Sequence, residues 1–257
     1  MRKSRSKAAV RRSVWKKLRS VARPNAFFHF NFAEYIADFE GSEKALRLLR
    51  KTALYRRARL IFITPDDCLE WLRDQALKDG KKVLVTSYGI RRGFFLLDPA
   101  RIPADKFLYA GTLEGMERVA SPIFLREMVA LGSVDLLVTG AGAINYQGIR
   151  VGKGHGYFDL EWAIFYSLGM VTDETPVFSV IHDCQVVRNR FDAERFDTAC
   201  DQIFTPTRSI RVRNPRKPTV GVIWSKLKGE MLRSIPPLRE LRRMSKGGEA
   251  IENSHSQ

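Results

Sequence analysis

The sequence predicts an α/β fold in which a mostly parallel sheet is covered by helices on both faces, giving three layers. Strand-like and helix-like segments alternate along most of the chain, an order typical of parallel sheets. The strand-like segments are short and apolar, as strands buried on both faces are. With 257 residues, 44% of them hydrophobic, the chain can bury a sizeable core.

The first half of the chain shows helix and strand signals in turn. Leu46, Leu49 and Leu54 share one side of a helical pattern. Pro65 closes an apolar strand, and Gly80 ends the helix that follows. We predict, in chain order, a helix over 42–57, a strand over 59–64, a helix from Asp66 or Asp67 to Lys78, strands over 83–86 and 94–97, a short strand at 107–109 and a helix over 123–131.

The second half continues the alternation around a glycine-rich segment. We predict a strand over 134–138, a helix over 157–170, and strands over 177–181, 202–204 and 220–224. In an open parallel sheet, ligands bind beyond the carboxyl ends of the strands. The segments expected to form this ligand cleft are 64–66, 87–92, 141–157 and 182–187.

The glycine-rich segment, residues 150–159, is the most informative part of the chain. Its alternate glycines let the backbone approach a ligand closely and adopt positive φ. The amides of such a loop and of the helix after it form a cradle for anions. Arg150 and Lys153 add positive charge, and Asp159 offers a carboxylate suited to Mg²⁺. The segment predicts a phosphate-binding loop, although it matches neither the dinucleotide nor the Walker A pattern, and a simple tight turn is the alternative.

His182 and Asp183 follow an apolar strand and form a second candidate site. At that position a side chain can act as an acid, a base or a metal ligand. The alternative is a loop cap, in which Asp183 bonds to nearby amides and His182 is packed and neutral. The spacing alone leaves both interpretations open.

The glycine-rich segment resembles the signature of the 5-formyltetrahydrofolate cyclo-ligase family. The family pattern Arg-x-Gly-x-Gly-x-Gly-Tyr-x-Asp is matched by Arg150, Gly152, Gly154, Gly156, Tyr157 and Asp159. Residues 181–187 look more like a divergent, cyclo-ligase-like branch of that family. The resemblance is strong over 130–210, fair over 40–130 and absent at the C-terminus.

The resemblance implies a fold similar to ribose-5-phosphate isomerase and an activity that uses ATP and Mg²⁺. ATP would phosphorylate the formyl oxygen of 5-formyltetrahydrofolate. Ring closure by N10 with loss of phosphate would then give 5,10-methenyltetrahydrofolate. In the family, a Lys-x-x-x-Arg pair on an N-terminal helix meets the phosphates. Here we assign the second position to Arg19, with Trp15 where the lysine is expected.

The resemblance also implies roles for individual residues. Those expected to bind the nucleotide are Arg19, Gly152, Lys153, Gly154, His155, Gly156 and Tyr157. Those expected to take part in catalysis are Arg150, Tyr157, His182 and Asp183, and Asp159 is expected to hold the metal.

Several positions depart from the family pattern. The middle glycine of the loop is His155, the second tyrosine is Phe158, and the basic residue after the aspartate is Leu160. The family's Gly-Ile-x-Glu-Pro segment, tied to folate binding, has no counterpart near residues 110–122. Nucleotide binding is therefore better preserved than folate binding, and a nucleotide- or folate-binding relative without turnover is the alternative function.

The net charge of +16 lies at the two ends of the chain. Residues 1–23 hold ten Lys or Arg and no acid, and residues 208–246 hold twelve Lys or Arg and two acids. We predict a basic, partly helical N-terminal segment (1–23), a single α/β domain (24–228) and a flexible basic tail (229–257). Basic ends can bind RNA through counterion release, so an RNA-associated protein is a further alternative. Few aromatic residues lie between these cations, which favours solvated extensions.

Cysteine content and hydropathy indicate a cytoplasmic protein. Cys68, Cys184 and Cys200 have no paired spacing, which points to a reducing compartment. No apolar run reaches the length of about 18 residues that a membrane span needs, and the N-terminus lacks the apolar core of a secretory signal. An acid-free, Arg-rich start also resembles an organelle transit peptide. The expected partners are ATP and a folate-like small molecule.

Overall fold

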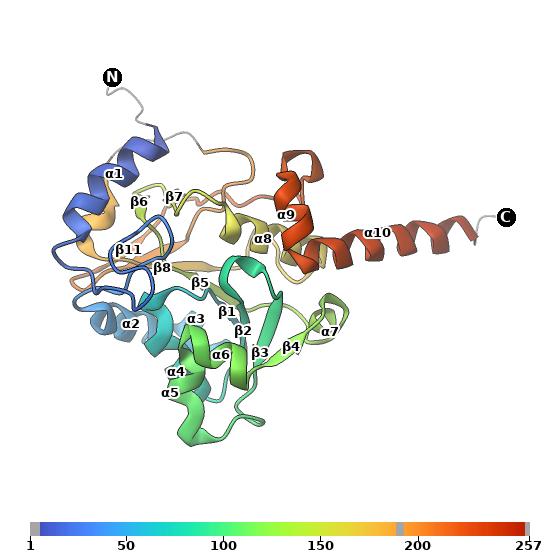
Figure 1. Ribbon diagram of the computed structural model, residues 1–257, viewed down its shortest axis with the longest axis horizontal. Helices are drawn as coiled ribbons and strands as arrows, with labels where there is room; N and C mark the ends of the chain where they lie inside the picture. Colours follow the sequence, from blue (N-terminus) through green and yellow to red (C-terminus); the bar gives the residue numbers. More distant parts are fainter. Residues whose placement is uncertain (1–5, 189–192, 255–257) are drawn as a thin grey trace.

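The computed structural model describes residues 6–188 and 193–254, and it confirms the three-layer α/β architecture (Figure 1). The strands are β1 (Leu60–Ile63), β2 (Lys82–Thr86), β3 (Phe94–Leu97), β4 (Ser121–Ile123), β5 (Leu136–Thr139), β6 (Ala143–Asn145), β7 (Arg150–Val151), β8 (Val177–Val180), β9 (Val186–Val187), β10 (Gln202–Phe204) and β11 (Ser209–Arg211). The α-helices are α1 (Lys7–Leu18), α2 (Ser42–Arg50), α3 (Ala53–Arg57), α4 (Glu70–Lys78), α5 (Phe107–Gly111), α6 (Leu113–Val119), α7 (Leu125–Ala130), α8 (Tyr157–Ser167), α9 (Gly229–Ser234) and α10 (Pro236–Ser254).

The main sheet has the strand order β11-β10-β8-β5-β1-β2-β3-β4. Its centre, from β10 to β2, is parallel. The antiparallel strands β3 and β4 extend one edge, and β11 extends the other. A smaller sheet, β7-β6-β9, lies beyond the carboxyl end of β5 in the chain. The sheet is thus mostly parallel, as predicted.

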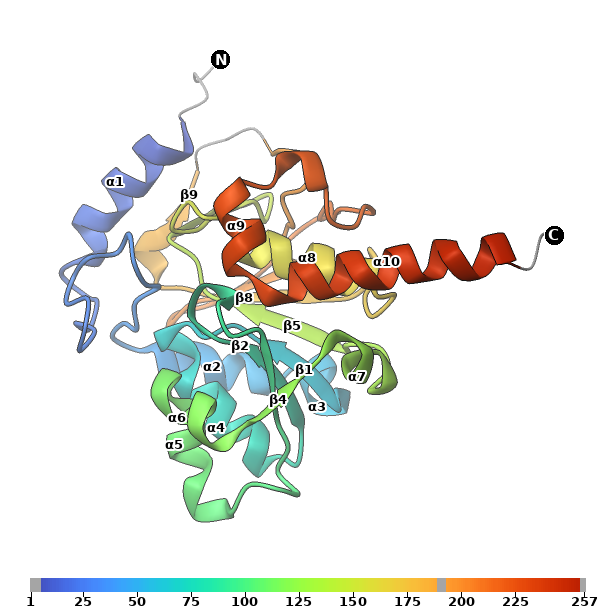
Figure 2. The ribbon, with the colours of Figure 1, turned by 45° about the vertical axis from the view of Figure 1, so that its right-hand side comes forward.

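The central strands are buried on both faces because successive side chains point to opposite sides. In β1, Leu60 and Phe62 pack with α7, α8 and the start of α10, whereas Ile61 and Ile63 pack with α2 to α6. Figures 1 and 2 show these two helical layers on either side of the sheet. The core is therefore divided by the sheet into two apolar clusters.

Most predicted elements are confirmed, but two predictions in the first half were wrong. The helix predicted over 42–57 is two helices, because the chain breaks at Thr52, whose hydroxyl accepts a hydrogen bond from the Tyr55 amide and begins α3. The strand predicted at 107–109 is part of the helix α5. This helix lies close against α4, since a Cβ at Gly111 would lie 2.7 Å from the backbone oxygen of Glu70.

The strand predicted at 220–224 was also wrong. This segment lies against α8, where the Val222 amide donates a hydrogen bond to Ser167 Oγ at 3.2 Å. A side chain at Gly221 would collide with Ser167. The segment therefore packs on a helix and pairs with no strand among the described residues, although its apolar sequence is strand-like.

The flexible tail predicted over 229–257 was wrong as far as residue 254, because the chain there forms α9 and α10; residues 255–257 lie outside the described residues. Ile235, Leu238 and Leu241 recur at helical spacing and are buried in the core. Beyond them α10 projects from the body of the molecule (Figure 2). Nowhere in the described part of the chain is a helix both long and apolar enough to pass through a bilayer.

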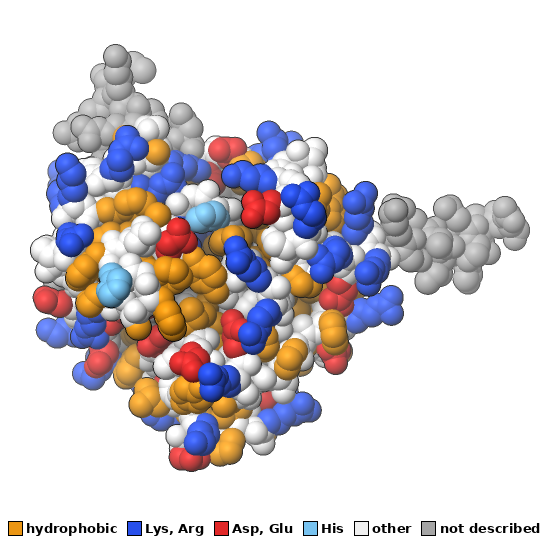
Figure 3. Space-filling model, in the orientation of Figure 1, with side chains coloured by type: hydrophobic (Ala, Val, Ile, Leu, Met, Phe, Trp, Pro, Cys, Tyr) orange, Lys and Arg blue, Asp and Glu red, His pale blue; other side chains and the backbone are white. Residues whose placement is uncertain are grey.

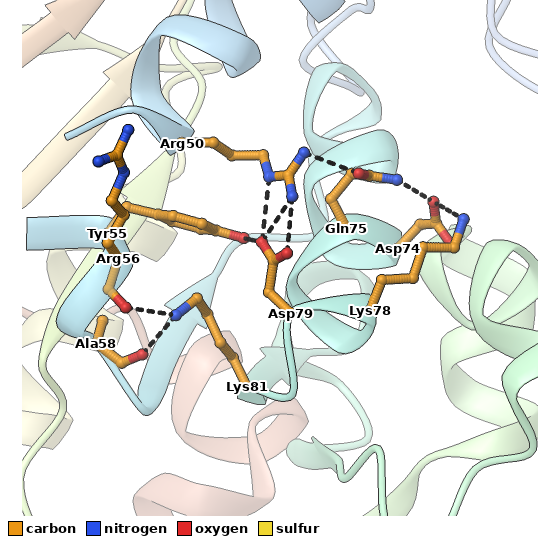
Figure 4. Close-up of polar contacts among 9 residues, drawn as sticks. All are labelled: Arg50, Tyr55, Arg56, Ala58, Asp74, Gln75, Lys78, Asp79 and Lys81. Carbon is orange, nitrogen blue, oxygen red and sulfur yellow. Dashed lines mark hydrogen bonds and ion pairs between the residues drawn. The ribbon is translucent and has the colours of Figure 1, made fainter. Parts of the chain in front are cut away.

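A network of polar side chains lies at the amino ends of β1 and β2 (Figure 4). The Tyr55 hydroxyl donates to Asp79 Oδ2 at 2.7 Å, and Arg50 donates to both oxygens of the same carboxylate. Lys81 Nζ donates to two backbone carbonyl groups that precede β1, at 3.2 and 2.8 Å. Burial raises the pKa of the Tyr55 phenol and lowers the pKa of Lys81. We call these four residues the Tyr55 network.

Candidate functional site

A cavity of about 480 Å³ opens at the carboxyl ends of β1, β2 and β5, a size typical of small-molecule sites. Thr64, Thr86 and Thr139, at the ends of these strands, line it. Three of the segments predicted to form the ligand cleft contribute residues: 64–66, 87–92 and 141–157. The fourth, 182–187, does not. The structure therefore places the cleft where parallel-sheet geometry predicted it.

The glycine loop, residues 152–156, lies between β7 and α8 and forms one wall of the cavity. Gly154 and Gly156 have φ of 115° and 73°, a region that strains other residues. A Cβ at Gly152 or Gly156 would meet nothing within 4 Å. Gly156 also caps α8, whose first amides have no partner within the helix. Free amides beside open space are suited to an anionic ligand.

Two cations of α1 lie beside this loop, and they were not the ones predicted. Arg11 Nη1 donates to the Gly152 carbonyl at 3.3 Å, and Lys7 Nζ pairs with Asp197 at 2.5 Å. Both side chains line the cavity. Arg19, predicted to bind the nucleotide, does not line it, and its guanidinium lies 4.9 Å from the centroid of the Phe30 ring.

The signal for these cations was present in the sequence. Lys7-x-x-x-Arg11 has the family's Lys-x-x-x-Arg spacing, which places both side chains on one side of a helix. Val10, Val14 and Leu18, all buried, lie on the same side of α1 as the two cations, because residues 7, 11, 14 and 18 recur at helical intervals. Val10 and Val14 pack on the small sheet. The side of α1 that packs on the protein therefore also carries the cations that reach the cavity.

Lys153 brings a further positive charge to the cavity. Its Nζ donates to the Glu34 carbonyl at 2.9 Å and lies 4.8 Å from the Tyr88 ring centroid and 5.9 Å from that of Tyr157. Burial lowers its pKa, and nearby carboxylates such as Asp66 oppose that shift. The aromatic faces partly replace the water that the ammonium loses.

Arg150 and Asp159 form an ion pair at the base of the loop. Arg150 Nη2 lies 3.0 Å from Asp159 Oδ1, and the side chains are 6% and 20% exposed. Arg150 also donates to the Thr198 carbonyl, and its guanidinium lies 4.0 Å from the centroid of Phe158. Burial raises the pKa of Asp159, whereas Arg150 lowers it. The pair ties β7 to the first turn of α8 and so fixes both ends of the glycine loop.

A magnesium ion at Asp159 is compatible with this arrangement. Within residues 6–188 and 193–254, no three His, Cys, Asp or Glu side chains gather into a metal cluster. Mg²⁺ in nucleotide sites usually takes one or two carboxylates and completes its shell with phosphate oxygens and water. Asp159 and Asp197 both line the cavity and therefore fit that need.

His155 lies in the glycine loop, and Tyr157 directly follows the loop at the start of α8. Their rings stack with centroids 5.4 Å apart, and both residues line the cavity. Burial raises the pKa of Tyr157 and lowers the pKa of His155, which Lys153 lowers further. Both residues, predicted to bind the nucleotide, thus lie at the wall of the cavity that the loop forms.

His182 and Asp183 lie outside the cavity and have local partners. His182 Nδ1 accepts a hydrogen bond from the Cys184 amide at 3.2 Å. Asp183 Oδ1 accepts the hydroxyl groups of Thr205 and Thr207 at 2.8 and 2.7 Å. These contacts match the loop-cap interpretation, and the catalytic roles predicted for both residues have no support from their positions.

Sequence reasoning missed two carboxyl groups in the cavity, Asp66 and Glu161. Asp66 Oδ2 accepts hydrogen bonds from Thr64 Oγ1 at 2.5 Å and from the Gly140 amide at 2.8 Å. Glu161 is buried, and its Oε1 accepts one from Thr86 Oγ1 at 2.6 Å. Glu161 follows Tyr157 by four residues, so the two share one side of α8. That spacing was the available signal.

Comparison with known proteins identifies relatives of the chain. Methenyltetrahydrofolate synthase domain-containing proteins of Homo sapiens and Danio rerio are 35% and 32% identical over 240 and 241 residues. The matches cover 92% and 91% of this chain but 61% and 60% of those proteins. The chain therefore spans about three fifths of their length.

Solved structures and a family model also match. The 5,10-methenyltetrahydrofolate synthetases of Aquifex aeolicus and Mycoplasma pneumoniae align with 86% and 77% of this chain and 99% and 98% of their own, at 17% and 13% identity and TM-scores of 0.49 and 0.46. The model of the 5-formyltetrahydrofolate cyclo-ligase family matches residues 3–206. On this sequence match, the chain belongs to the 5-formyltetrahydrofolate cyclo-ligase family.

Proposed function

We propose that this protein is a cyclo-ligase that uses ATP and Mg²⁺ to convert 5-formyltetrahydrofolate into 5,10-methenyltetrahydrofolate, ADP and phosphate. Family membership supports the reaction type. The observation that carries the proposal is the cavity beneath the glycine loop, where open backbone and several cations meet. Phosphoryl transfer needs mainly positioning and neutralisation of charge, and this wall supplies both.

In the proposed reaction, each residue around the loop has a role that follows from its chemistry. The amides of 152–156 and the start of α8 would hold the phosphate chain, with Lys153, Lys7 and Arg11 neutralising its charge. Asp159 would hold Mg²⁺, which would supply positive charge to neutralise the phosphates. Arg150 would keep that carboxylate in place through their ion pair. Tyr157 would line the site beside the reacting groups.

In the reaction itself, the formyl oxygen takes the γ-phosphoryl group of ATP and ADP leaves. N10 of the folate then bonds to the formyl carbon and loses its proton, and the carbon–oxygen bond to phosphate breaks. The measurement that tests the proposal is the absorbance of methenyltetrahydrofolate in a mixture of protein, ATP, Mg²⁺ and 5-formyltetrahydrofolate. Product that requires both ATP and Mg²⁺ is expected. Binding of both substrates without product would support the alternative, a binding relative without turnover.

The basic ends of the chain fit this proposal better than an RNA-associated role. Figure 3 shows Lys and Arg side chains over α1 and around the start of α10. In α1, however, Lys7 and Arg11 face the cavity. Part of the N-terminal charge is therefore used within the site. The three cysteines are unpaired, which supports the proposed cytoplasmic location.

A further inference from the structure

Residues 218–231 form a wall of the cavity that has no role in the mechanism above. They lie beyond residues 3–206, the range that the family model matches. Trp162 Nε1 of α8 donates a hydrogen bond to the Pro218 carbonyl at 3.0 Å, and the Val222 amide donates to the same helix. Because α8 also carries residues of the cavity, these two bonds fix the wall relative to the site.

Two lysines of this wall, Lys226 and Lys228, line the cavity and are exposed. In the described part of the chain, neither ammonium group forms an ion pair or a side-chain hydrogen bond. The other lysines of the cavity differ, because Lys7 pairs with a carboxylate and Lys153 donates to a carbonyl group. An ammonium group has three hydrogen-bond donors. Lys226 and Lys228 can therefore bind an anion without giving up an existing partner.

The rest of the wall is mainly apolar. The apolar residues that it contributes to the cavity include Val220, Val222, Ile223, Leu227 and Met231. Leu227 and Met231 also pack against the core, which keeps this surface in place. Small-molecule sites combine apolar walls with a few placed polar groups that fix the ligand. An apolar wall with two cations therefore suits a ligand in which a ring or chain is joined to anionic groups.

One end of the folate substrate has this chemistry. It consists of a benzoyl ring joined to a glutamate, whose two carboxylate groups are both ionised at neutral pH. Two carboxylates match two lysines in number and in sign of charge, and the ring matches the apolar residues beside them.

ATP is the other source of oxyanions in the proposed reaction. Lys228 lies near the glycine loop: burial lowers the pKa of His155, and the positive charges of Lys153 and Lys228 lower it further. The loop, however, already has cations from α1, where Arg11 donates to the Gly152 carbonyl. Figure 1 shows α1 and α9, which follows Lys228 directly, on separate sides of β6 and β7. The wall thus adds a second group of cations, apart from the first, for a second anionic ligand.

We propose that Lys226 and Lys228 bind the two carboxylates of the substrate's glutamate, while the apolar residues beside them cover its benzoyl ring. This inference rests on the proposed function, because it assigns the tail end of the folate within the same cavity. It makes residues 218–231 a determinant of substrate affinity, separate from the groups that hold the nucleotide.

The test compares, by calorimetry, the dissociation constants for 5-formyltetrahydrofolate and for 5-formyltetrahydropteroate, which lacks the glutamate. The unaltered protein should bind the first compound roughly fivefold more tightly, the gain expected from two exposed ion pairs, and added salt should reduce this preference. In Lys226→Gln/Lys228→Gln the two constants should be equal, because only the constant for the glutamate-bearing compound rises. The constant for ATP should be the same in both proteins.

Lys44→Gln/Lys106→Gln is the matched control, because it removes the same charge from two exposed lysines that do not line the cavity. It should keep the preference of the unaltered protein. No preference in the unaltered protein, or a preference retained in Lys226→Gln/Lys228→Gln, overturns the inference alone. Weaker binding of ATP by that variant, with the preference unchanged, would assign the lysines to the phosphates and overturns it as well. If the unaltered protein binds neither folate compound, the proposed function falls together with the inference.

Discussion

The cavity and the Tyr55 network lie at opposite ends of the same strands, and both contain a tyrosine, an Arg–Asp pair and a lysine, which is buried in the network and partly buried in the cavity. In the network the polar groups satisfy one another: Asp79 accepts from Tyr55 and Arg50, and Lys81 is held by two carbonyl groups. In the cavity, the ammonium of Lys153 has one carbonyl partner and two aromatic faces. Gly152 and Gly156 border open space.

The difference shows what separates a structural network from a binding site. Burial lowers the pKa of Lys81 and of Lys153 alike, and it raises that of both tyrosines. Shifted pKa values by themselves therefore do not mark a site. The cavity differs from the network because its polar groups keep hydrogen-bonding capacity that a ligand would have to fill.

The largest effect is expected from the two ion pairs. Arg150→Gln leaves the largely buried carboxylate of Asp159 without its cation and should lower the free energy of unfolding by about 3 kcal/mol. Arg50→Gln is the matched change in the network, where both partners are more exposed, at 28% and 29%, and should cost about 1 kcal/mol or less. Urea unfolding at pH 7 measures both. Equal losses would remove the distinction between the two pairs.

Glu161→Gln should change how stability depends on pH. The folded-state pKa of Glu161 is raised from 4.5 to about 8, so the stabilisation from its neutral form is complete below pH 4.5 and is lost as the pH rises to 8. The glutamine variant does not titrate. Its free energy of unfolding, relative to that of the unaltered protein, should therefore rise by about 2–4 kcal/mol between pH 5 and pH 8. Urea midpoints at the two pH values measure the gain. A constant difference would contradict it.

Gly154→Ala should separate activity from stability. The new methyl group would lie 2.9 Å from Arg11 Nη1 in a backbone with φ of 115°, and displacement of the loop should lower kcat/KM for ATP roughly 100-fold. Gly80→Ala is the control beside the network, at φ of 73° with nothing within 4 Å. It should cost about 1 kcal/mol of stability and leave turnover unchanged. Similar kinetics for the two variants would disprove the loop's role.

The smallest effect is expected from the tyrosines. Tyr55→Phe removes the hydrogen bond to Asp79 and should cost about 1 kcal/mol at pH 7. Since the pKa of Tyr55 is raised above 10.0, its contribution is complete below pH 10 and is lost above it, so the gap between variant and unaltered protein should narrow there. Tyr157→Phe at the cavity should change stability little. Thermal unfolding of both variants at pH 7 and pH 10.5 measures these losses of stability. Equal losses for Tyr55→Phe and Tyr157→Phe would contradict the prediction.

Sequence reasoning located the fold and the loop because both depend on local residue types. Apolar runs identify buried strands, and only glycine suits the loop's backbone at Gly154. It failed where tertiary contacts decide. From sequence alone, an acid within a helix, such as Glu161, is expected to face solvent, and only the tertiary structure shows that the sheet covers it. The local sequence of His182-Asp183 is equally compatible with a loop cap and with a catalytic pair.

The ends of the chain were misjudged for a related reason. Charge dominates their composition, so the apolar spacing of Leu238 and Leu241 and the Lys7–Arg11 spacing were overlooked. In each case a few residues at helical intervals, among many cations, determine where the segment packs.

The docking of α1 beside the glycine loop has a thermodynamic consequence. A ligand that contacts Arg11 gains affinity when the helix is docked, so by reciprocity the ligand must hold the helix in place. Cleavage of the first helix by a protease should therefore slow when the nucleotide is present. The rate of that cleavage would report site occupancy without any need for turnover.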